Sequence, residues 1–146
     1  MQSELIVQAA RLWLGTPYRH QASQKGAGTD CLGLLRGVWR EVLGFEPTRV
    51  PAYKNDWSEP QGGGRTLGSR ACASNSKALD HAAMGDVLLF RMRVGAVAKH
   101  LGIQGNVGSE PSFIHAYSGH GVLESPLSAL WQRRIVARFE FPEEGA

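Results

Sequence analysis

The hydrophobic pattern of this chain changes its period once, and that change limits the folds it can adopt. Up to Leu43 the apolar residues recur at helical spacing, whereas after Gly85 they form short runs separated by glycine-rich turns. Helices first and strands second are typical of an α+β fold with a small antiparallel sheet. The 146 residues, of which 42% are apolar, suffice for one core, so we expect one domain over 1–146.

Two helices are predicted in the first third of the chain. The first has apolar positions Leu5, Ile6, Ala9, Leu12 and Trp13 and ends at Gly15. The second has apolar positions Cys31, Leu34, Leu35, Val38, Trp39 and Val42. Either Thr29 or Asp30 serves as its N-cap, and Gly44 ends it. Cys31 therefore lies in the first turn of a predicted helix.

Strands are predicted in the second half. They cover 86–92, 100–104, 112–116, 121–124 and 134–141. Ser125 and Pro126 predict the start of one or two helical turns around Leu130 and Trp131. Prolines, three consecutive glycines and weak periodicity predict an irregular insertion at about 45–80, with a short helix over 76–82 at its end.

Composition and charge exclude several classes of protein. The net charge is only +3 and the arginines are scattered, so no basic stripe predicts a nucleic-acid partner. No apolar stretch is long enough to cross a membrane, and the first residues carry no signal-peptide pattern. We therefore expect synthesis in the cytoplasm without membrane insertion. Cys31 and Cys72 lie in unlike contexts, which argues against a disulfide framework.

Cys31 is the first candidate for chemistry. A thiol acts as a nucleophile when it is a thiolate, and the exposed N–H groups and dipole at a helix N-terminus stabilise that negative charge. A lone cysteine in an apolar helical pattern is more often a core residue. Here, however, a polar loop leads directly into Asp30, Gly33 leaves room beside the thiol, and two histidines lie on predicted strands.

His100 and His115 are the candidates for a base and its orienting partner. If their strands form a hairpin whose register is centred on the loop 105–111, His100 lies directly opposite His115, with Cβ atoms roughly 5 Å apart. His20, His81 and His120 lie in turn-like or polar segments, and we interpret them as structural. A zinc site is the weaker alternative, because no short pair of ligands anchors one, so we predict no metal and no cofactor.

With these residues located, the chain resembles the NlpC-type cell-wall cysteine peptidases, papain-like enzymes of bacteria and phages, over most of its length. The ordered motifs are Gly15-Thr16-Pro17-Tyr18, Asp30-Cys31, the strand start Gly85-Asp86, His100-Leu101-Gly102-Ile103 and Phe113-Ile114-His115-Ala116. The resemblance implies a papain-like α+β fold with the catalytic cysteine at a helix N-terminus.

The resemblance also implies hydrolysis of an amide bond in the peptidoglycan stem peptide through a thioester intermediate. Cys31 would be the nucleophile, His100 the base and His115 the orienting member. Tyr18, Asp30 and Leu32 would line the substrate cleft. Leu32 stands where the family usually has serine.

Two departures resemble the phage-tail branch of the family. His20 and Gln21 replace a usual glycine pair, and the insertion is longer than a minimal catalytic domain needs. The resemblance therefore implies incorporation into a virion or tail-like particle with other tail proteins, acting on the wall from the periplasm. The alternative is a structural tail-tip or wall-binding module with reduced or no activity, which Leu32 favours.

Overall fold

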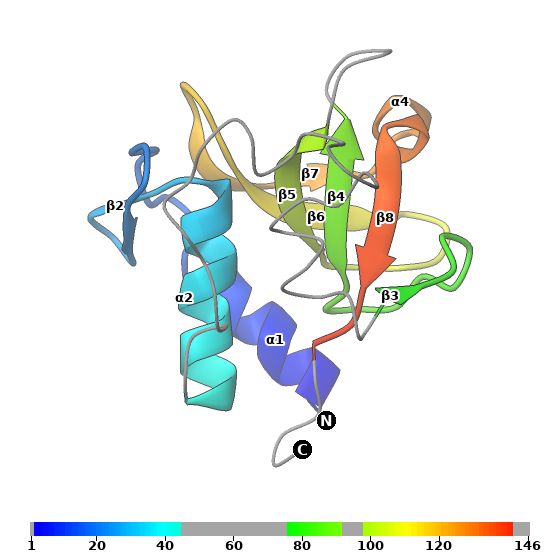
Figure 1. Cartoon of the computed structure of the whole chain (residues 1–146), viewed down its shortest axis with the longest axis horizontal. Helices are drawn as coiled ribbons and strands as arrows, with labels where there is room; N and C mark the ends of the chain where they lie inside the picture. The colour runs from blue at the N-terminus through cyan, green and yellow to red at the C-terminus, as the bar shows by residue number, and fades with distance from the viewer. Residues whose placement is uncertain (1, 45–75, 92–97, 142–146) are drawn as a thin grey trace, which may run out of the picture.

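The computed structural model describes residues 2–44, 76–91 and 98–141. Helices α1 and α2 pack against a six-stranded antiparallel sheet, and a two-stranded sheet lies beside α2 (Figure 1). The helices are α1 (Gln2–Arg11), α2 (Cys31–Leu43) and α4 (Ala129–Arg133). The strands are β1 (Ser23–Gln24), β2 (Gly28–Thr29), β3 (Ser76–Lys77), β4 (Val87–Arg91), β5 (Ala98–Gln104), β6 (Ser112–Tyr117), β7 (Gly121–Pro126) and β8 (Ile135–Phe139). The predicted α+β class is confirmed.

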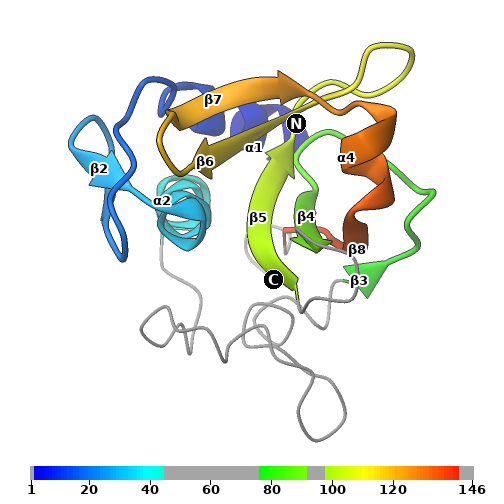
Figure 2. The same ribbon diagram turned by 90° about the horizontal axis from the view of Figure 1, so that it is seen from above.

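The larger sheet has the strand order β3-β8-β4-β5-β6-β7. Seen from above, α2 lies between the two-stranded sheet and β5, and it contacts both β5 and β6 (Figure 2). The five predicted strands correspond to β4 through β8, with ends that differ by a few residues. One domain over 1–146 and an irregular insertion at about 45–80 stay predictions, since residues 45–75, with Cys72 among them, lie outside the described residues.

Helix α2 follows its prediction closely. Asp30 is the N-cap, and its carboxylate accepts a hydrogen bond from the backbone N–H of Gly33 at 2.7 Å. Gly44 ends the helix in the left-handed conformation, with φ 83°. Between these caps, Leu34 and Val38 are fully buried against the sheet. Local sequence signals alone therefore fix both ends of the helix that carries Cys31.

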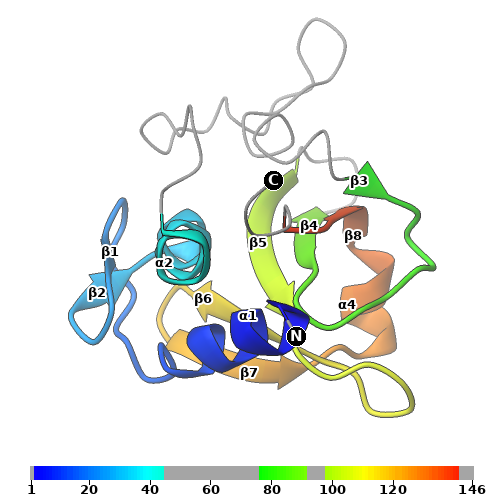
Figure 3. The ribbon, with the colours of Figure 1, turned by 90° about the horizontal axis from the view of Figure 1, so that it is seen from below.

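Helix α1 buries part of its predicted apolar pattern. It packs beside α2 (Figure 3) and buries Ile6, Val7 and Ala10, while Leu5 and Leu12 are 50% and 68% exposed. Of the other predicted apolar positions, Trp13 is buried and Ala9 is half-buried. Burial of Val7 and Ala10 in place of Leu5 and Leu12 turns the smaller side chains of α1 toward the core.

The predicted helix over 76–82 was wrong. Ser76 and Lys77 form β3, which pairs with β8 at the edge of the sheet. The Lys77 amino group lies 3.1 Å from the Asp86 carboxylate and 3.0 Å from that of Glu140. These ion pairs across neighbouring strands hold the segment extended, and helical periodicity alone could not reveal them.

The predicted helix start at Ser125 was also wrong. Strand β7 continues to Pro126, and α4 begins only at Ala129, after Ser128 as N-cap. Leu127 is buried between the two elements. Ser125 is therefore a strand residue, and its side chain faces the neighbouring strand β6 instead of capping a helix.

None of the helices in the described ranges is long and apolar enough to cross a membrane.

Candidate active site

Cys31 is the first residue of α2 and is buried, with 3% of its surface exposed. Both carboxylate oxygens of the preceding Asp30 accept backbone N–H groups, one from Gly33 at 2.7 Å and one from Gln21 at 2.6 Å. Asp30 therefore ties the incoming loop to the first turn of the helix. This arrangement holds the thiol at the positive end of the helix dipole.

The structure gives a different reason for glycine at position 33 from the predicted one. A Cβ at this position would come within 1.8 Å of the carbonyl oxygen of Ala22. The space beside Gly33 is thus filled by the backbone of the incoming loop and is not left open next to the thiol. The glycine lets loop and helix approach closely, which fixes the position of Asp30 and Cys31.

Tyr18 also lies near Cys31 and Asp30. It is half-buried and forms an isolated bridge with Thr29, just before the helix. Burial, and then the negative charges of Cys31 and Asp30, raise the pKa of Tyr18 to about 12. Its phenol therefore stays protonated and can donate a hydrogen bond near the thiol.

His100 and His115 form a direct hydrogen bond. The Nε2 atom of His100 lies 2.8 Å from the Nδ1 atom of His115, and the ring centroids are 5.0 Å apart at 76°. The two residues are 6% and 1% exposed. The expected pairing of the two rings is thus present in the structure.

The predicted strand register was wrong by two residues. In the structure Ile103 pairs with Ile114, so that continuing the register brings Tyr117, and not His115, opposite His100. The turn closes where Gly105 donates to the carbonyl of Ser112 at 2.8 Å. Because side chains alternate with a period of two, a shift of two residues keeps both histidines on one face. The two histidine side chains therefore meet diagonally across strands β5 and β6.

A third member, Ser125 on β7, was missed by the sequence analysis. Its Oγ lies 3.0 Å from Nε2 of His115. A signal did exist: His115 pairs with Leu123 on β7, and Ser125 is two residues further along the same face. The structure therefore contains a hydrogen-bonded row of His100, His115 and Ser125.

An aromatic shell encloses this row. Trp131 on α4 lies 5.4 Å from His115 and 6.1 Å from His100, measured between ring centroids. Phe113 lies 4.1 Å from His115, and Phe90 lies 5.8 Å from His100. The shell excludes water from the imidazoles, and burial costs the charged form more than the neutral one.

The histidine pKa values follow from this burial. Desolvation lowers the pKa of His100 to about 4. Desolvation, with repulsion from His100 and then His120, lowers the pKa of His115 to about 3. Both imidazoles are neutral near pH 7, so each ring carries one protonated and one unprotonated nitrogen.

The thiol and the histidine row lie in different apolar surroundings. Cys31 packs in the larger apolar cluster beneath α1 and α2, together with Leu101. The histidines lie among the rings of the smaller cluster, which contains Phe90 and Phe113. The two groups are connected through the packing of α2 on β5 and β6.

Leu32 is largely a core residue. It packs in the larger cluster and is 9% exposed. Little of its side chain is open to a substrate.

The remaining histidines lie outside the row. The rings of His20 and His81 are 62% and 73% exposed, beside Asp30 and Asp80 respectively. His120 stacks on Tyr117 at 5.4 Å and influences the pKa of His115, so it lies closer to the row than its turn position indicated. In the described ranges no three His, Cys, Asp or Glu side chains are arranged to hold a metal ion.

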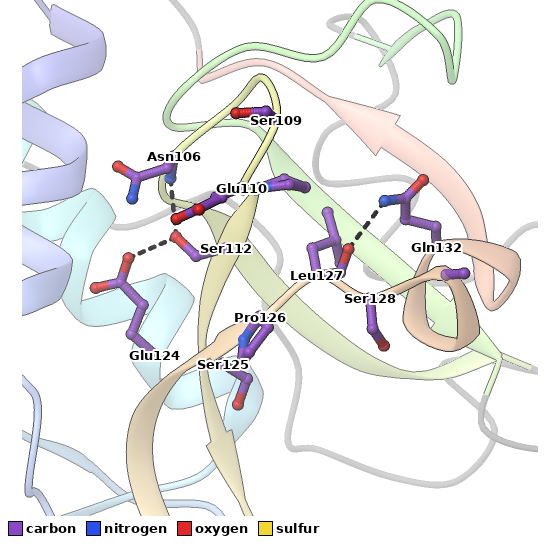
Figure 4. Close-up of a pocket in the computed structure, with 12 residues that line it drawn as sticks. Asn106, Ser109, Glu110, Ser112, Glu124, Ser125, Pro126, Leu127, Ser128 and Gln132 are labelled. Carbon is purple, nitrogen blue, oxygen red and sulfur yellow. Dashed lines mark hydrogen bonds between the residues drawn. The ribbon is translucent and has the colours of Figure 1, made fainter.

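A pocket of about 760 Å³ lies between the β5–β6 loop and the junction of β7 with α4 (Figure 4). On one side of it, Ser112 donates to Glu124 at 2.6 Å and accepts from the backbone N–H of Asn106 at 2.9 Å. Ser125 also lines this pocket, whereas Cys31 and the two histidines do not. Ser125 is therefore the member of the row that reaches the pocket.

These features define a papain-like α+β domain with a thiol at a helix N-terminus and a histidine pair on neighbouring strands. The chain belongs to the NlpC/P60 family, whose model matches residues 15–140.

Two curated proteins with sequences similar to this chain are hydrolytic enzymes by name. The murein DD-endopeptidase MepS/murein LD-carboxypeptidase of Escherichia coli (strain K12) is 29% identical over 123 residues, which cover 84% of this chain and 54% of that protein. The gamma-DL-glutamyl hydrolase of Bacillus subtilis (strain 168) is 28% identical over 138 residues, covering 92% of this chain and 29% of that one. The chain thus spans about half the length of the first relative and under a third of the second.

A solved structure shares the fold over nearly its whole length. It is the NlpC/p60 domain of the peptidoglycan hydrolase SagA, with a TM-score of 0.66 and 22% sequence identity. The alignment covers 94% of this chain and 97% of that domain. At this identity the likeness shows the fold alone, and it agrees with the predicted class.

Proposed function

We propose that this chain is a cysteine peptidase that hydrolyses an amide bond in the stem peptide of peptidoglycan. The observation that carries the proposal is the 2.8 Å hydrogen bond between His100 and His115 in an NlpC/P60 domain whose Cys31 begins α2. The names of both curated relatives support it, since each describes hydrolysis of cell-wall or glutamyl bonds.

The proposed reaction follows from the tautomers of the histidine pair. His100 uses Nε2 toward His115, which leaves Nδ1 as the nitrogen for the thiol proton. As Cys31 attacks the amide carbon, His100 takes the thiol proton and then passes it to the leaving amine, giving a thioester. Water, deprotonated by His100, attacks the thioester and releases the carboxylic acid and the thiol. His115 holds the orientation of His100 throughout.

This reaction requires the thiol and Nδ1 of His100 to reach hydrogen-bond distance when substrate binds. Such contacts are often long without substrate and tighten in the complex. Burial lowers the pKa of His100 to about 4, which disfavours a resting ion pair between its imidazolium and the thiolate.

The three residues that were predicted to line the substrate cleft have different roles in this proposal. Tyr18 carries a protonated hydroxyl near the thiol and would donate a hydrogen bond to the substrate. Asp30 has both oxygens bound to backbone N–H groups, so it positions the thiol. Leu32 would contribute to the cleft only through its 9% exposed surface.

The test is turnover of purified peptidoglycan and of defined muropeptides. Wild type, Cys31→Ala and, as a matched control at the second cysteine, Cys72→Ala are compared, and mass spectrometry identifies the new amine and carboxyl termini. We expect Cys31→Ala to lose turnover and Cys72→Ala to keep it. Turnover that survives in Cys31→Ala, or a folded wild type without any, contradicts the proposal. The products also show which bond is cut.

A second candidate function is a wall-binding or tail-tip module with reduced or no activity. One observation favours it: Leu32 stands where the family usually has serine. Such a module would sediment with peptidoglycan equally well as wild type and as Cys31→Ala, and would release no muropeptide.

We also propose assembly with other tail proteins into a virion or tail-like particle that acts on the wall from the periplasm. The departures at His20 and Gln21 support this by analogy with the phage-tail branch. Mass spectrometry of purified particles from the source cells tests it. Absence of the chain from those particles contradicts it.

A further inference from the structure

The hydrogen-bonded row has two possible proton arrangements. In one, His100 donates from Nε2 to Nδ1 of His115, and His115 donates from Nε2 to Oγ of Ser125. In the other, every hydrogen points the opposite way: Ser125 donates to His115, His115 donates to His100, and the proton of His100 sits on Nδ1. Only the first arrangement leaves Nδ1 of His100 unprotonated, as a base must be.

We propose that Ser125 is a positioning residue that holds His115 in the tautomer protonated on Nε2, so that His100 presents an unprotonated Nδ1 as the base. This inference rests on the proposed function, because it assigns the base of that reaction. It adds a fourth residue that acts through His115 and touches neither the thiol nor the substrate.

The position of Ser125 supports its role as an acceptor. Its hydroxyl oxygen lies 3.0 Å from His115, which is 1% exposed, while Ser125 itself is half-buried and lines the pocket shown in Figure 4. In Figure 4 the side chain of Ser125 points away from Ser112 and Glu124, which are engaged with one another. Ser125 can therefore donate its own hydrogen to solvent in the pocket and accept from His115.

Removal of the hydroxyl would change the balance between the arrangements. Without Ser125 Oγ, a proton on Nε2 of His115 becomes a buried donor without an acceptor, and such donors are rarer in proteins than unsatisfied acceptors. The pair would then favour a proton on Nδ1 of His115, which reverses the hydrogen bond to His100. His100 would hold its own proton on Nδ1 and could not accept one from the thiol.

The experiment combines NMR with kinetics on the full chain. Long-range ¹H–¹⁵N correlation spectra of ¹⁵N-histidine-labelled protein at pH 7 report which nitrogen of His115 is protonated. We expect Nε2 in wild type and in Ser125→Thr, which keeps a hydroxyl, and Nδ1 as the main form in Ser125→Ala. The matched control is Ser128→Ala, which removes an exposed hydroxyl that lines the same pocket and makes no capping hydrogen bond.

Turnover kinetics provide a second test of the role of Ser125. We expect Ser125→Ala to lower kcat about tenfold, as the loss of one hydrogen bond can, with KM unchanged, whereas Ser125→Thr and Ser128→Ala stay within twofold of wild type. A wild-type His115 protonated on Nδ1, or a tautomer unchanged in Ser125→Ala, overturns the inference even if turnover is observed. If no protein turns over muropeptides, the proposed function fails while the spectra still decide the tautomer.

Discussion

The indole ring of Trp13 lies against Gly37, where α1 leads into its following turn and crosses α2. A Cβ at position 37 would come within 2.1 Å of the ring, and Trp13 is fully buried. The indole therefore packs directly on the backbone of α2, so glycine at position 37 allows the two helices to approach closely.

Gly37→Ala is expected to destabilise the protein by about 1–3 kcal/mol, the usual cost of overpacking a core. Alanine is the better helix former by roughly 0.5–1 kcal/mol, so the steric cost has to exceed this gain. Urea unfolding measures the difference. Leu12→Ala on the exposed face of α1 is the control, with an expected change within about 0.5 kcal/mol. An unchanged or raised stability of Gly37→Ala contradicts the close contact.

A buried ion pair between Asp86 and Arg138 joins β8 to the start of β4. The Arg138 guanidinium, 4% exposed, donates to Asp86 at 2.8 Å and to the side-chain oxygen of Gln104 at 2.9 Å. Asp86→Ala leaves this charge buried without its carboxylate, so we expect a loss of about 3–5 kcal/mol in the free energy of unfolding.

The control for that prediction is a substitution of Glu140, a second carboxylate near strands β4 and β8. Glu140 also pairs with Lys77, but its side chain is 59% exposed. Exposed pairs contribute little because water screens them, so Glu140→Ala is expected to cost under about 1 kcal/mol. Equal losses in the two variants would mean that the buried pair adds nothing beyond an exposed one.

Stability is expected to fall on acidification because the buried histidines stay neutral in the fold. The unfolded chain takes up these protons near the ordinary pKa of 6.5, while the folded protein does so only near about 4 at His100 and about 3 at His115. Between these values the unfolded state binds more protons, so the free energy of unfolding decreases as pH falls. The stabilisation is complete above pH 6.5 and is lost progressively below it.

The slope is about 1.4 kcal/mol per pH unit for each histidine in this window. Comparing the pH dependence of urea unfolding in wild type and in His100→Gln isolates the contribution of one ring. His81→Gln is the control, because its ring is 73% exposed and no burial effect is expected. A wild-type curve that is flat from pH 6.5 to pH 4.5 contradicts the burial of neutral imidazoles.

Local patterns predicted α2, its two caps and the strands β4 to β8, because caps, periodicity and glycine turns are encoded by neighbouring residues. The pairing of His100 with His115 was predicted from alternation, which survives a register shift of two residues. The register of these two strands was not predicted, since the seven-residue loop 105–111 does not fix how the strands pair. Ser125 was missed because a Ser-Pro pair also marks a helix start.

The surroundings of His100 carried a signal that was not used. In the run His100-Leu101-Gly102-Ile103, the apolar residues Leu101 and Ile103 must face the core beneath α2, and both do. Alternation then points the His100 ring away from these two side chains, toward Phe90 and Trp131. Sequence spacing alone gave the residue types of the site but not the face of the sheet on which each one lies.

Cys31 is expected to react with iodoacetamide at pH 7 faster than Cys72, because Cys31 lies at a helix N-terminus with a base proposed nearby. Burial of Cys31 opposes this, so the comparison measures whether the helix dipole and His100 prevail over desolvation. Peptide mapping by mass spectrometry follows each thiol separately. In His100→Gln we expect Cys31 to slow at least tenfold while Cys72, as internal control, keeps its rate. If the rate at Cys31 does not depend on residue 100, His100 is not the base that serves this thiol.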